Sequence, residues 1–159
     1  MHHVPRQRLR SLNSTVAVVA LAVTAADALS KWWARSSVAA HGTHVAGPLW
    51  WRLQYNTGVS FSFSHGLPMV TAIVTLVVAV GLLGVGLRAH RGLPTWGFGL
   101  LLGGGVANVV DRWLATPHEV TDFIAVGSFP VFNLADAAVS VGFLLLLTAV
   151  VRGKRLVAA

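Results

Sequence analysis

The chain has 159 residues, of which 55% are hydrophobic and only 11% are charged, and this composition excludes an ordinary soluble domain. It contains no cysteine, which excludes disulfides, thiolate metal sites and cysteine nucleophiles. The formal net charge is +7. The basic residues stand at the ends of apolar segments, as in a membrane protein, and are not interleaved with aromatic residues in a polar domain. We therefore expect an integral membrane protein with no nucleic-acid partner.

The N-terminal part predicts a cytoplasmic tail over residues 1–13 and a first transmembrane helix over 14–33. Taken alone, this region also resembles a cleavable signal peptide, because it has a basic front, an apolar middle and small residues near its end. We favour a retained helix, since three more apolar segments follow and the flanking basic residues alternate to match. Asp27 and Lys31 lie four residues apart near the outer end of this helix, in the order that favours an ion pair.

The next segment, residues 34–48, contains glycines and a proline and predicts a loop. His41 and His44 lie in it, but no nearby acid or cysteine completes a set of metal ligands. The sequence also contains no HExxH motif and no compact His/Asp cluster. We therefore expect neither a metal nor a cofactor.

Apolar and polar residues roughly alternate over 49–64, on either side of Asn56-Thr57-Gly58. This pattern predicts two short strands joined by a turn. Asn tolerates unusual backbone angles and Gly supplies a positive φ, so Asn56 and Gly58 have a simple interpretation as turn residues.

Three further apolar segments predict transmembrane helices over 68–87, 96–113 and 134–151, and residues 152–159 predict a second cytoplasmic tail. Four spans place both termini and the loop after the second helix on one side. That side carries the basic residues Arg6, Arg8, Arg10, Arg88, Arg91, Arg152, Lys154 and Arg155. Because basic residues collect in cytoplasmic loops, we expect both termini to be cytoplasmic.

The predicted fold is an all-α integral membrane protein with four transmembrane helices. A small extracytoplasmic β-sheet is expected between the first and second helices. We expect a single membrane domain over residues 1–159, and a monomer.

The five acids are Asp27, Asp111, Glu119, Asp122 and Asp136, and in this topology all lie near the outer membrane surface. Asp111 ends the third helix, where the helix dipole gives it no stabilising role. It adjoins a polar face formed by Gly104, Asn108 and Arg112. Asp136 stands in the first turn of the fourth helix, where Asn133 can cap. Antiparallel neighbouring helices would bring Asp111 and Asp136 to one depth, and two carboxyls sharing a water form an aspartic-protease pattern.

Five motifs occur in order along residues 14–151 and together resemble the bacterial lipoprotein signal peptidases, or signal peptidase II. They are Asp27-Ala-Leu-Ser-Lys31, Asn56-Thr-Gly58, Gly104-Gly-Val-Ala-Asn108-Val-Val-Asp111-Arg112, Val120-Thr-Asp122-Phe123 and Phe132-Asn133-Leu-Ala135-Asp136. The resemblance implies a membrane aspartic endopeptidase of the bacterial inner membrane, with its site near the extracytoplasmic surface. Such enzymes remove the signal peptide from prolipoproteins just before a cysteine that carries diacylglycerol, so the implied partners are these substrates and membrane lipid.

By the same resemblance, Asp111 and Asp136 form the catalytic pair. The residues implied to line or support the substrate pocket are Asn56, Gly58, Asn108, Arg112 and Asn133. Asp122 is implied to be either a structural acid or one that supports the catalytic pair from behind, and Asp27 and Lys31 to be supporting residues.

Two other functions fit a small membrane protein with acids. In a proton- or ion-coupled transporter subunit, the carboxylates should lie near the bilayer midplane, often beside broken helices. Here the central portions of the four predicted spans carry no charge. A purely structural assembly protein would leave Asp111 without a role.

Overall fold

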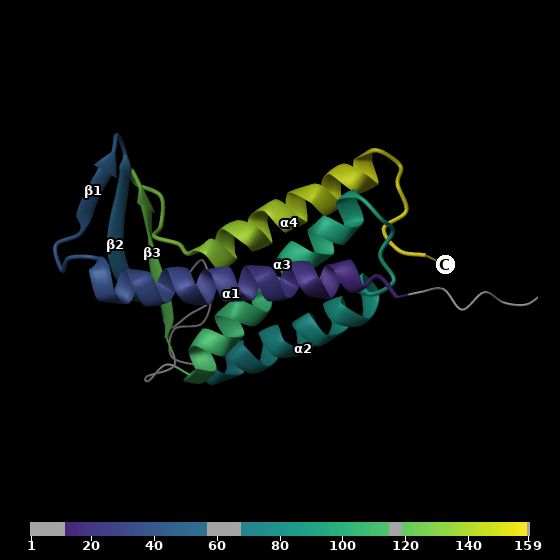
Figure 1. Cartoon of the computed structure of the whole chain (residues 1–159), viewed down its shortest axis with the longest axis horizontal. Coiled ribbons are helices and arrows are strands. Elements are labelled where there is room, and N and C mark those ends of the chain that lie inside the picture. The colour runs from purple at the N-terminus through teal and green to yellow at the C-terminus, as the bar shows by residue number, and fades with distance from the viewer. Residues whose placement is uncertain (1–11, 57–67, 115–118, 159) are drawn as a thin grey trace, which may run out of the picture.

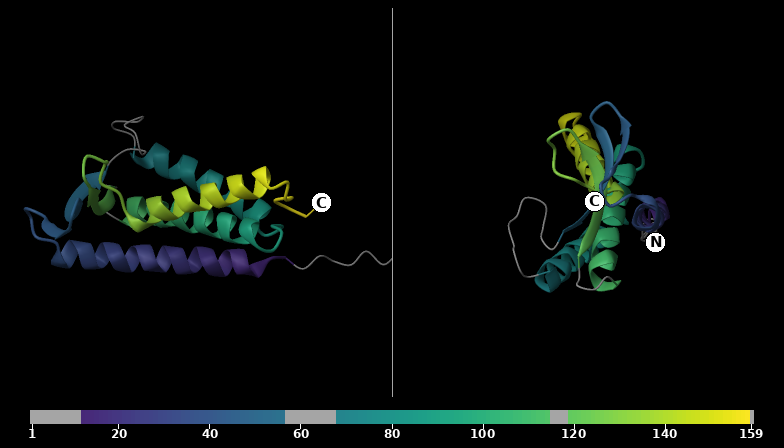
Figure 2. Two further views of the ribbon diagram at one scale, coloured as in Figure 1. Left: turned by 90° about the horizontal axis from the view of Figure 1, so that it is seen from above. Right: turned by 90° about the vertical axis from the view of Figure 1, so that its left-hand side faces the viewer.

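The computed structural model describes residues 12–56, 68–114 and 119–158. Its helices are α1 (Ser14–Ser37), α2 (Pro68–Gly86), α3 (Leu93–Leu114) and α4 (Leu134–Val151), and its strands are β1 (Thr43–Ala46), β2 (Leu49–Asn56) and β3 (Val120–Val126). The helices run side by side along the long axis, and the three strands form a sheet at one end of them (Figure 1). The C-terminus lies at the opposite end (Figures 1 and 2).

Helix α3 is the centre of the bundle and packs against the other three helices. Glycines allow the close approach. A Cβ atom on Gly103 would lie 2.7 Å from the carbonyl oxygen of Ala20 in α1. One on Gly104 would lie 2.5 Å from the carbonyl oxygen of Ala135 in α4. Small residues thus let the α3 backbone touch both neighbours, as is common between membrane helices.

This packing predicts opposite outcomes for two adjacent alanine substitutions. Gly104→Ala should lower the free energy of unfolding by about 1–3 kcal/mol, because the new methyl group overlaps the α4 backbone. Gly105→Ala meets no atom within 4 Å and should be neutral or stabilising by up to about 1 kcal/mol through helix propensity. Thermal and denaturant unfolding in detergent would measure both, and equal stability of the two variants would contradict the close α3–α4 contact.

The exterior of the helices is apolar, the reverse of a soluble bundle. On α2, Val74, Val77 and Val80 are exposed, and on α4 Phe143 and Leu144 are exposed. Such a continuous apolar surface is typical of contact with lipid. Within the described residues, α1, α3 and α4 are long and apolar enough to cross a membrane, and α2 adds a shorter apolar stretch, Ile73–Gly86. The expected all-helical membrane core is therefore confirmed in its coarse form.

The sheet corrects three local predictions. Strand β1 lies in the segment 34–48, for which the sequence predicts a loop, and it pairs with β2 across a turn at Gly47. The predicted hairpin turn at Asn56–Gly58 is wrong in its first half, because Asn56 is the last residue of β2 and pairs with Val120. Residues 57–64 of the predicted strands lie outside the described part.

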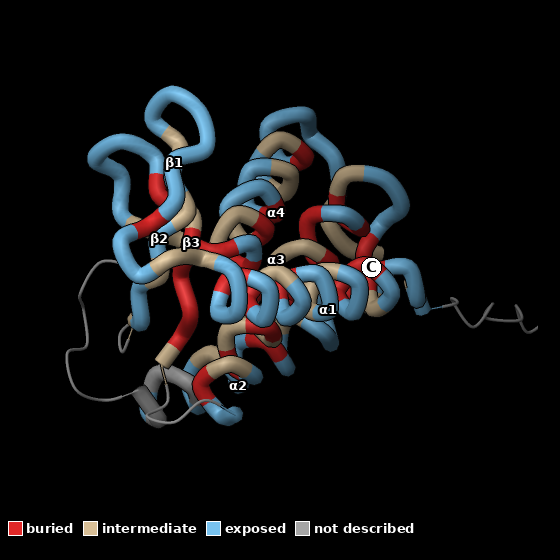
Figure 3. The backbone as a smooth tube through the Cα atoms, turned by 60° about the vertical axis from the view of Figure 1, so that its left-hand side comes forward, coloured by how far each residue is buried: buried red, intermediate tan, exposed pale blue. Residues whose placement is uncertain are grey.

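The third correction concerns the sheet's origin. Its third strand, β3, follows α3, so the sheet is not built only from the segment between the first two helices. After β3 the chain turns back, and the backbone of Phe132 exchanges hydrogen bonds with Ile124, at 2.8 and 3.0 Å. This return places the start of α4 beside β3. Figure 3 shows most of β3 buried between the helices and the rest of the sheet.

Candidate active site

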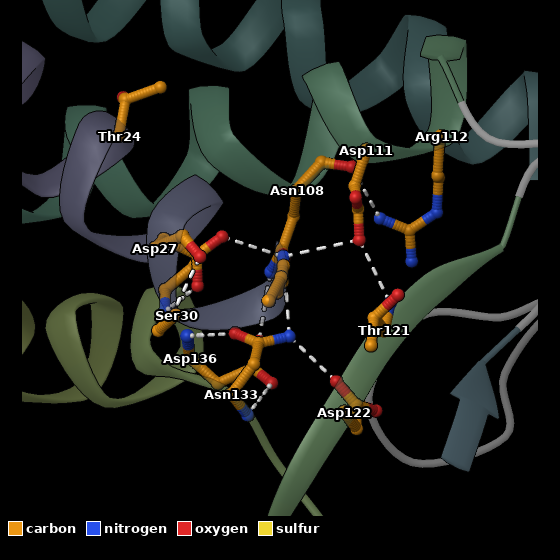
Figure 4. Close-up of polar contacts among 12 residues, drawn as sticks. Thr24, Asp27, Ser30, Asn108, Asp111, Arg112, Thr121, Asp122, Asn133 and Asp136 are labelled. Atoms are coloured by element: carbon orange, nitrogen blue, oxygen red, sulfur yellow. Dashed lines mark hydrogen bonds and ion pairs between the residues drawn. The ribbon is translucent and has the colours of Figure 1, made fainter. Parts of the chain in front are cut away.

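The polar side chains of α1, α3, α4 and β3 meet where the helices join the sheet (Figure 4). Asp27 and Lys31 of α1 form an ion pair with 2.7 Å between Oδ2 and Nζ, and each side chain is only 1% exposed. The other oxygen of Asp27 accepts a hydrogen bond of 2.8 Å from the backbone N–H of Ala135. This N–H is one of the first in α4 and has no partner within the helix. Asp27 therefore ties α1 to the beginning of α4.

Asn108 of α3 links this ion pair to Asp136. Its side-chain oxygen accepts a hydrogen bond from Lys31 Nζ at 3.0 Å. Its side-chain nitrogen donates to Asp136 Oδ1 at 2.9 Å. Because an amide oxygen only accepts and an amide nitrogen only donates, the bond from Lys31 to the oxygen turns the nitrogen of Asn108 toward the Asp136 carboxylate.

Asn133 caps α4 and lies between two acids. It forms a capping box with Asp136: its side-chain oxygen accepts from the Asp136 backbone N–H at 2.9 Å, and Asp136 Oδ2 accepts from the Asn133 N–H at 3.3 Å. Its side-chain nitrogen donates to Asp122 Oδ1 at 2.6 Å. Asn133 is fully buried. A single side chain therefore contacts Asp122 of the sheet and Asp136 of α4 (Figure 4).

Asp122 is buried, with 2% of its surface exposed. Besides the contact with Asn133, its Oδ2 accepts a hydrogen bond of 3.2 Å from Asn56 Nδ2, across the β2–β3 pairing. Burial, and then the nearby charge of Asp136, raise the pKa of Asp122 from its ordinary 3.8 to about 7, although the bonds from Asn56 and Asn133 act in the opposite direction. A carboxyl whose pKa is raised by burial and by a neighbouring carboxylate is typical of an acid in a functional site.

Asp111 has different surroundings. Its Oδ2 lies 3.4 Å from Lys31 Nζ and accepts a 2.8 Å hydrogen bond from the Thr121 backbone N–H. Its Oδ1 lies 3.5 Å from Nη2 of Arg35, and Nη1 of the same guanidinium donates to Thr121 Oγ1 at 3.1 Å. Both oxygens of Asp111 are therefore held by cations of α1 and by β3, and the contacts described for it do not include Asp136.

Arg35 and Thr121 were not predicted from the sequence. Arg35 could have been found, since it follows Lys31 by one helical turn and continues the face on which Asp27 and Lys31 lie. Thr121 gave no such signal, because its contact depends on where β3 crosses α3.

A pocket of about 180 Å³ opens between α1 and α3 on the Asp111 side of this network. Its lining consists of Thr24, Asp27, Ala28, Lys31, Arg35, Ala107, Val110, Asp111 and Leu114. Its wall is thus apolar along the helices and charged at the end near the sheet. Within the described residues, no three His, Asp or Glu side chains are grouped so that they could hold a metal ion.

The structure brings most of the predicted site residues into this one network. Those joined by the contacts above are Asp27, Lys31, Asn56, Asn108, Asp111, Asp122, Asn133 and Asp136. Arg112 is also buried, and its guanidinium donates to the backbone oxygen of Asn108 at 3.3 Å. Gly58 lies outside the described residues. Gly104 serves the packing of α3 against α4.

Comparison with solved structures supports the fold. The chain superimposes on a bacterial membrane enzyme solved by the in meso method with a TM-score of 0.79 and 24% sequence identity, covering 88% of this chain and 89% of that one. A second bacterial membrane enzyme solved by the same method gives a TM-score of 0.76 and 23% identity, covering 90% of this chain and 97% of that one. At these identities the likeness concerns the fold alone.

Sequence comparison identifies the family. The family model described as signal peptidase (SPase) II matches residues 19–152. The lipoprotein signal peptidase of Mycobacterium leprae is 36% identical over 149 residues, covering 90% of this chain and 72% of the relative. That of Mycobacterium tuberculosis H37Rv is 38% identical over 151 residues, covering 89% and 71%. With most of the chain covered and the motifs gathered in one network, the chain belongs to the signal peptidase II family.

Proposed function

We propose that the chain is an aspartic endopeptidase that cleaves prolipoproteins just before the diacylglyceryl-modified cysteine, and that Asp122 and Asp136 are its catalytic pair. Family membership supports the protease function. It gives no support to the alternative of an ion-coupled transporter.

The observation that supports this pair is the position of Asn133. Its side chain contacts Asp122 Oδ1 at 2.6 Å, and it shares a capping box with Asp136. The charge of Asp136 also contributes to raising the pKa of Asp122 to about 7, after the larger effect of burial. With that pKa, Asp122 keeps its proton up to about neutral pH, and an aspartic peptidase needs one protonated carboxyl in its pair.

The contacts of Asp111 favour a structural role instead of the catalytic one predicted from the sequence. Lys31 and Arg35 both lie within 3.5 Å of its oxygens, and the Thr121 N–H occupies Oδ2. These contacts occupy both oxygens of Asp111, whereas a catalytic carboxyl must present an oxygen to water or to the substrate. We therefore assign Asp111 to the joint between α1, α3 and β3.

In the proposed reaction, the Asp136 carboxylate takes a proton from water while the water oxygen attacks the scissile carbonyl carbon. The protonated Asp122 donates a hydrogen bond to the carbonyl oxygen as negative charge develops there. Collapse of the tetrahedral intermediate breaks the C–N bond, and the leaving nitrogen receives the proton taken up by Asp136. Asn108 and Asn133 hold the two acids in place.

The direct test uses a purified precursor carrying diacylglycerol on its cysteine, and the same precursor without the lipid. We expect release of the signal peptide from the modified precursor only, with the lipidated cysteine as the new N-terminus by mass spectrometry. Absence of cleavage by folded protein would contradict the proposal, and so would inhibition by chelators.

The raised pKa of Asp122 predicts the pH dependence. Asp122 is protonated below about pH 7 and loses its proton above it, so kcat/KM should fall about tenfold per pH unit on the alkaline side of pH 7. Rates measured across pH 5–9 with one modified precursor would test this. A flat profile from pH 7 to 9 would contradict the assignment of Asp122 as the acid.

The pH dependence of the free energy of unfolding gives an independent check on the proton of Asp122. Because the folded pKa exceeds the ordinary 3.8, the contribution of protonated Asp122 to stability is complete below about pH 3.8 and is lost as the pH rises through about 7. Asp122→Asn should flatten this part of the pH dependence of unfolding. An unchanged pH dependence would show that another group binds the proton.

We further propose four membrane spans in one domain, a monomeric state, contact with membrane lipid, both termini in the cytoplasm, and the catalytic pair near the extracytoplasmic surface. The apolar exterior of all four helices and the basic residues at one end support this arrangement.

Cysteine labelling tests this topology, and because the chain contains no cysteine each introduced cysteine is the only one that can react. Val45→Cys in β1 should react with an impermeant maleimide added outside, and Lys154→Cys only after the membrane is opened. The reverse pattern would overturn the topology.

A further inference from the structure

The end of the molecule opposite the sheet carries a surface that the proposed reaction does not use. The segment after α4 folds back on the α2–α3 connection: Ala89 and Val157 form an antiparallel bridge. The His90 N–H donates to the oxygen of Leu156 at 3.0 Å, and the Ala158 N–H donates to the oxygen of Arg88 at 2.9 Å. Leu156 and Val157 also pack against the apolar core cluster around Val16 and Phe98. The C-terminal segment is therefore part of the fold (Figures 1 and 2).

This pairing brings two groups of exposed cations together. The basic surface consists of Arg88, Arg91, Arg152, Lys154 and Arg155, all of them exposed. All five acids of the chain lie toward the other end, in the network described above or beside it at Glu119. Asp136, for example, precedes Arg152 by the length of α4, about 24 Å at 1.5 Å per residue. That separation exceeds the screening length of about 8 Å at physiological ionic strength, so the acids cannot neutralise the basic surface.

The basic surface also lies at the edge of the apolar exterior. Val150 and Val151, exposed at the end of α4, directly precede Arg152. Trp96, 54% exposed, stands in the first turns of α3 at the same end, and such tryptophans favour the headgroup layer. In a membrane, cations at the headgroup level can reach lipid phosphates.

We propose that the basic surface binds the headgroups of anionic phospholipids in the leaflet on its side of the membrane. The partner's chemistry follows from the surface: several unneutralised guanidinium groups suit phosphate oxygens, and the adjoining valines and tryptophan suit acyl chains. The folded C-terminal segment holds Arg152, Lys154 and Arg155 beside Arg88 and Arg91, so that the cations act together. This inference rests on membrane insertion and not on the proposed catalytic pair.

The test measures the thermal unfolding of the purified full chain in neutral detergent as phosphatidylglycerol or phosphatidylcholine is added. Phosphatidylglycerol should raise the unfolding temperature, since it binds the folded state, and salt should weaken the effect. Arg155→Gln should weaken the apparent affinity about fivefold, and the triple variant Arg152→Gln/Lys154→Gln/Arg155→Gln about a hundredfold, from about 1 kcal/mol per cation. Arg52→Gln, which removes one exposed cation from β2 at the sheet end, should leave the affinity unchanged.

Three outcomes would overturn the proposal. Phosphatidylcholine could raise the unfolding temperature as much as phosphatidylglycerol does, which would indicate a general lipid effect. Inorganic triphosphate could replace the lipid, which would indicate a site for soluble anions. The triple variant could keep the full affinity, which would place the lipid elsewhere. Because cleavage is not measured, none of these results depends on the identity of the catalytic acids.

Discussion

Asp122→Asn is expected to reduce cleavage of a lipid-modified precursor by about 10²–10⁴-fold, the usual loss when a general acid or base is removed. Asparagine keeps the size of the side chain and one oxygen acceptor for Asn56 or Asn133, so the protein should remain folded. Asp136→Asn should cause a similar loss. The double variant should be no worse than either single one, because two members of one catalytic unit are not additive.

Asp111→Asn is the matched comparison, since it is the same substitution at the acid that the sequence analysis pairs with Asp136. It keeps an oxygen for the Thr121 N–H but loses the charge that holds Lys31 and Arg35. It should lower the unfolding temperature, and its activity per folded molecule should exceed that of Asp122→Asn by at least about tenfold. A folded, inactive Asp111→Asn beside an active Asp122→Asn would restore Asp111 as the partner of Asp136. Cleavage rates normalised to the folded fraction would decide between the two pairs.

The helices could be predicted from the sequence because their signal is local. Each is an apolar run bounded by polar or turn residues, and α4 in particular begins at the capping residue Asn133. Helix α1 continues for four residues, Ala34–Ser37, beyond its predicted end at residue 33, and this extension is mostly polar. These residues stay helical because Arg35 is held by β3 and Asp111, a contact between distant parts of the chain.

The strands could not be predicted as well, because their evidence is not local. Strand β3 is buried along most of its length. It therefore lacks the alternation of apolar and polar residues that marks a strand with one solvent-exposed face. Its neighbour in the sheet, β2, lies more than 60 residues earlier. The same non-local pairing brings Asn56 to Asp122.

The proposed catalytic pair also depends on contacts between residues that are far apart in the sequence. Helix direction alone places Asp111 and Asp136 at one depth. It could not reveal that α1 would supply two cations to Asp111. Nor could it reveal that the chain reversal at Phe132 would bring Asn133 against Asp122. The sequence motifs contain all three acids, Asp111, Asp122 and Asp136. The role proposed for each acid depends on which side chains contact it in the folded protein.

Lys31 has the largest expected effect on stability. Its Nζ is 2.7 Å from Asp27, 3.0 Å from Asn108 and 3.4 Å from Asp111, and the side chain is 1% exposed. Lys31→Met would preserve the apolar stem but leave two carboxylates without this cation. Removing one partner of a buried ion pair typically costs about 3–5 kcal/mol, because the remaining charge is left uncompensated.

A double-mutant cycle separates that uncompensated charge from the loss of packing. Asp27→Asn/Lys31→Met removes the charge of Asp27 together with that of Lys31, while the asparagine oxygen introduced by Asp27→Asn can still accept a hydrogen bond from the Ala135 N–H. The double variant should therefore be more stable than Lys31→Met alone, with a coupling of about 1–3 kcal/mol. Arg52→Met, at an exposed cation of β2, should change the unfolding free energy by less than about 0.5 kcal/mol. If Lys31→Met behaved like Arg52→Met, the ion pair would not hold α1 against the start of α4, and Asn108 would need another explanation for its orientation toward Asp136.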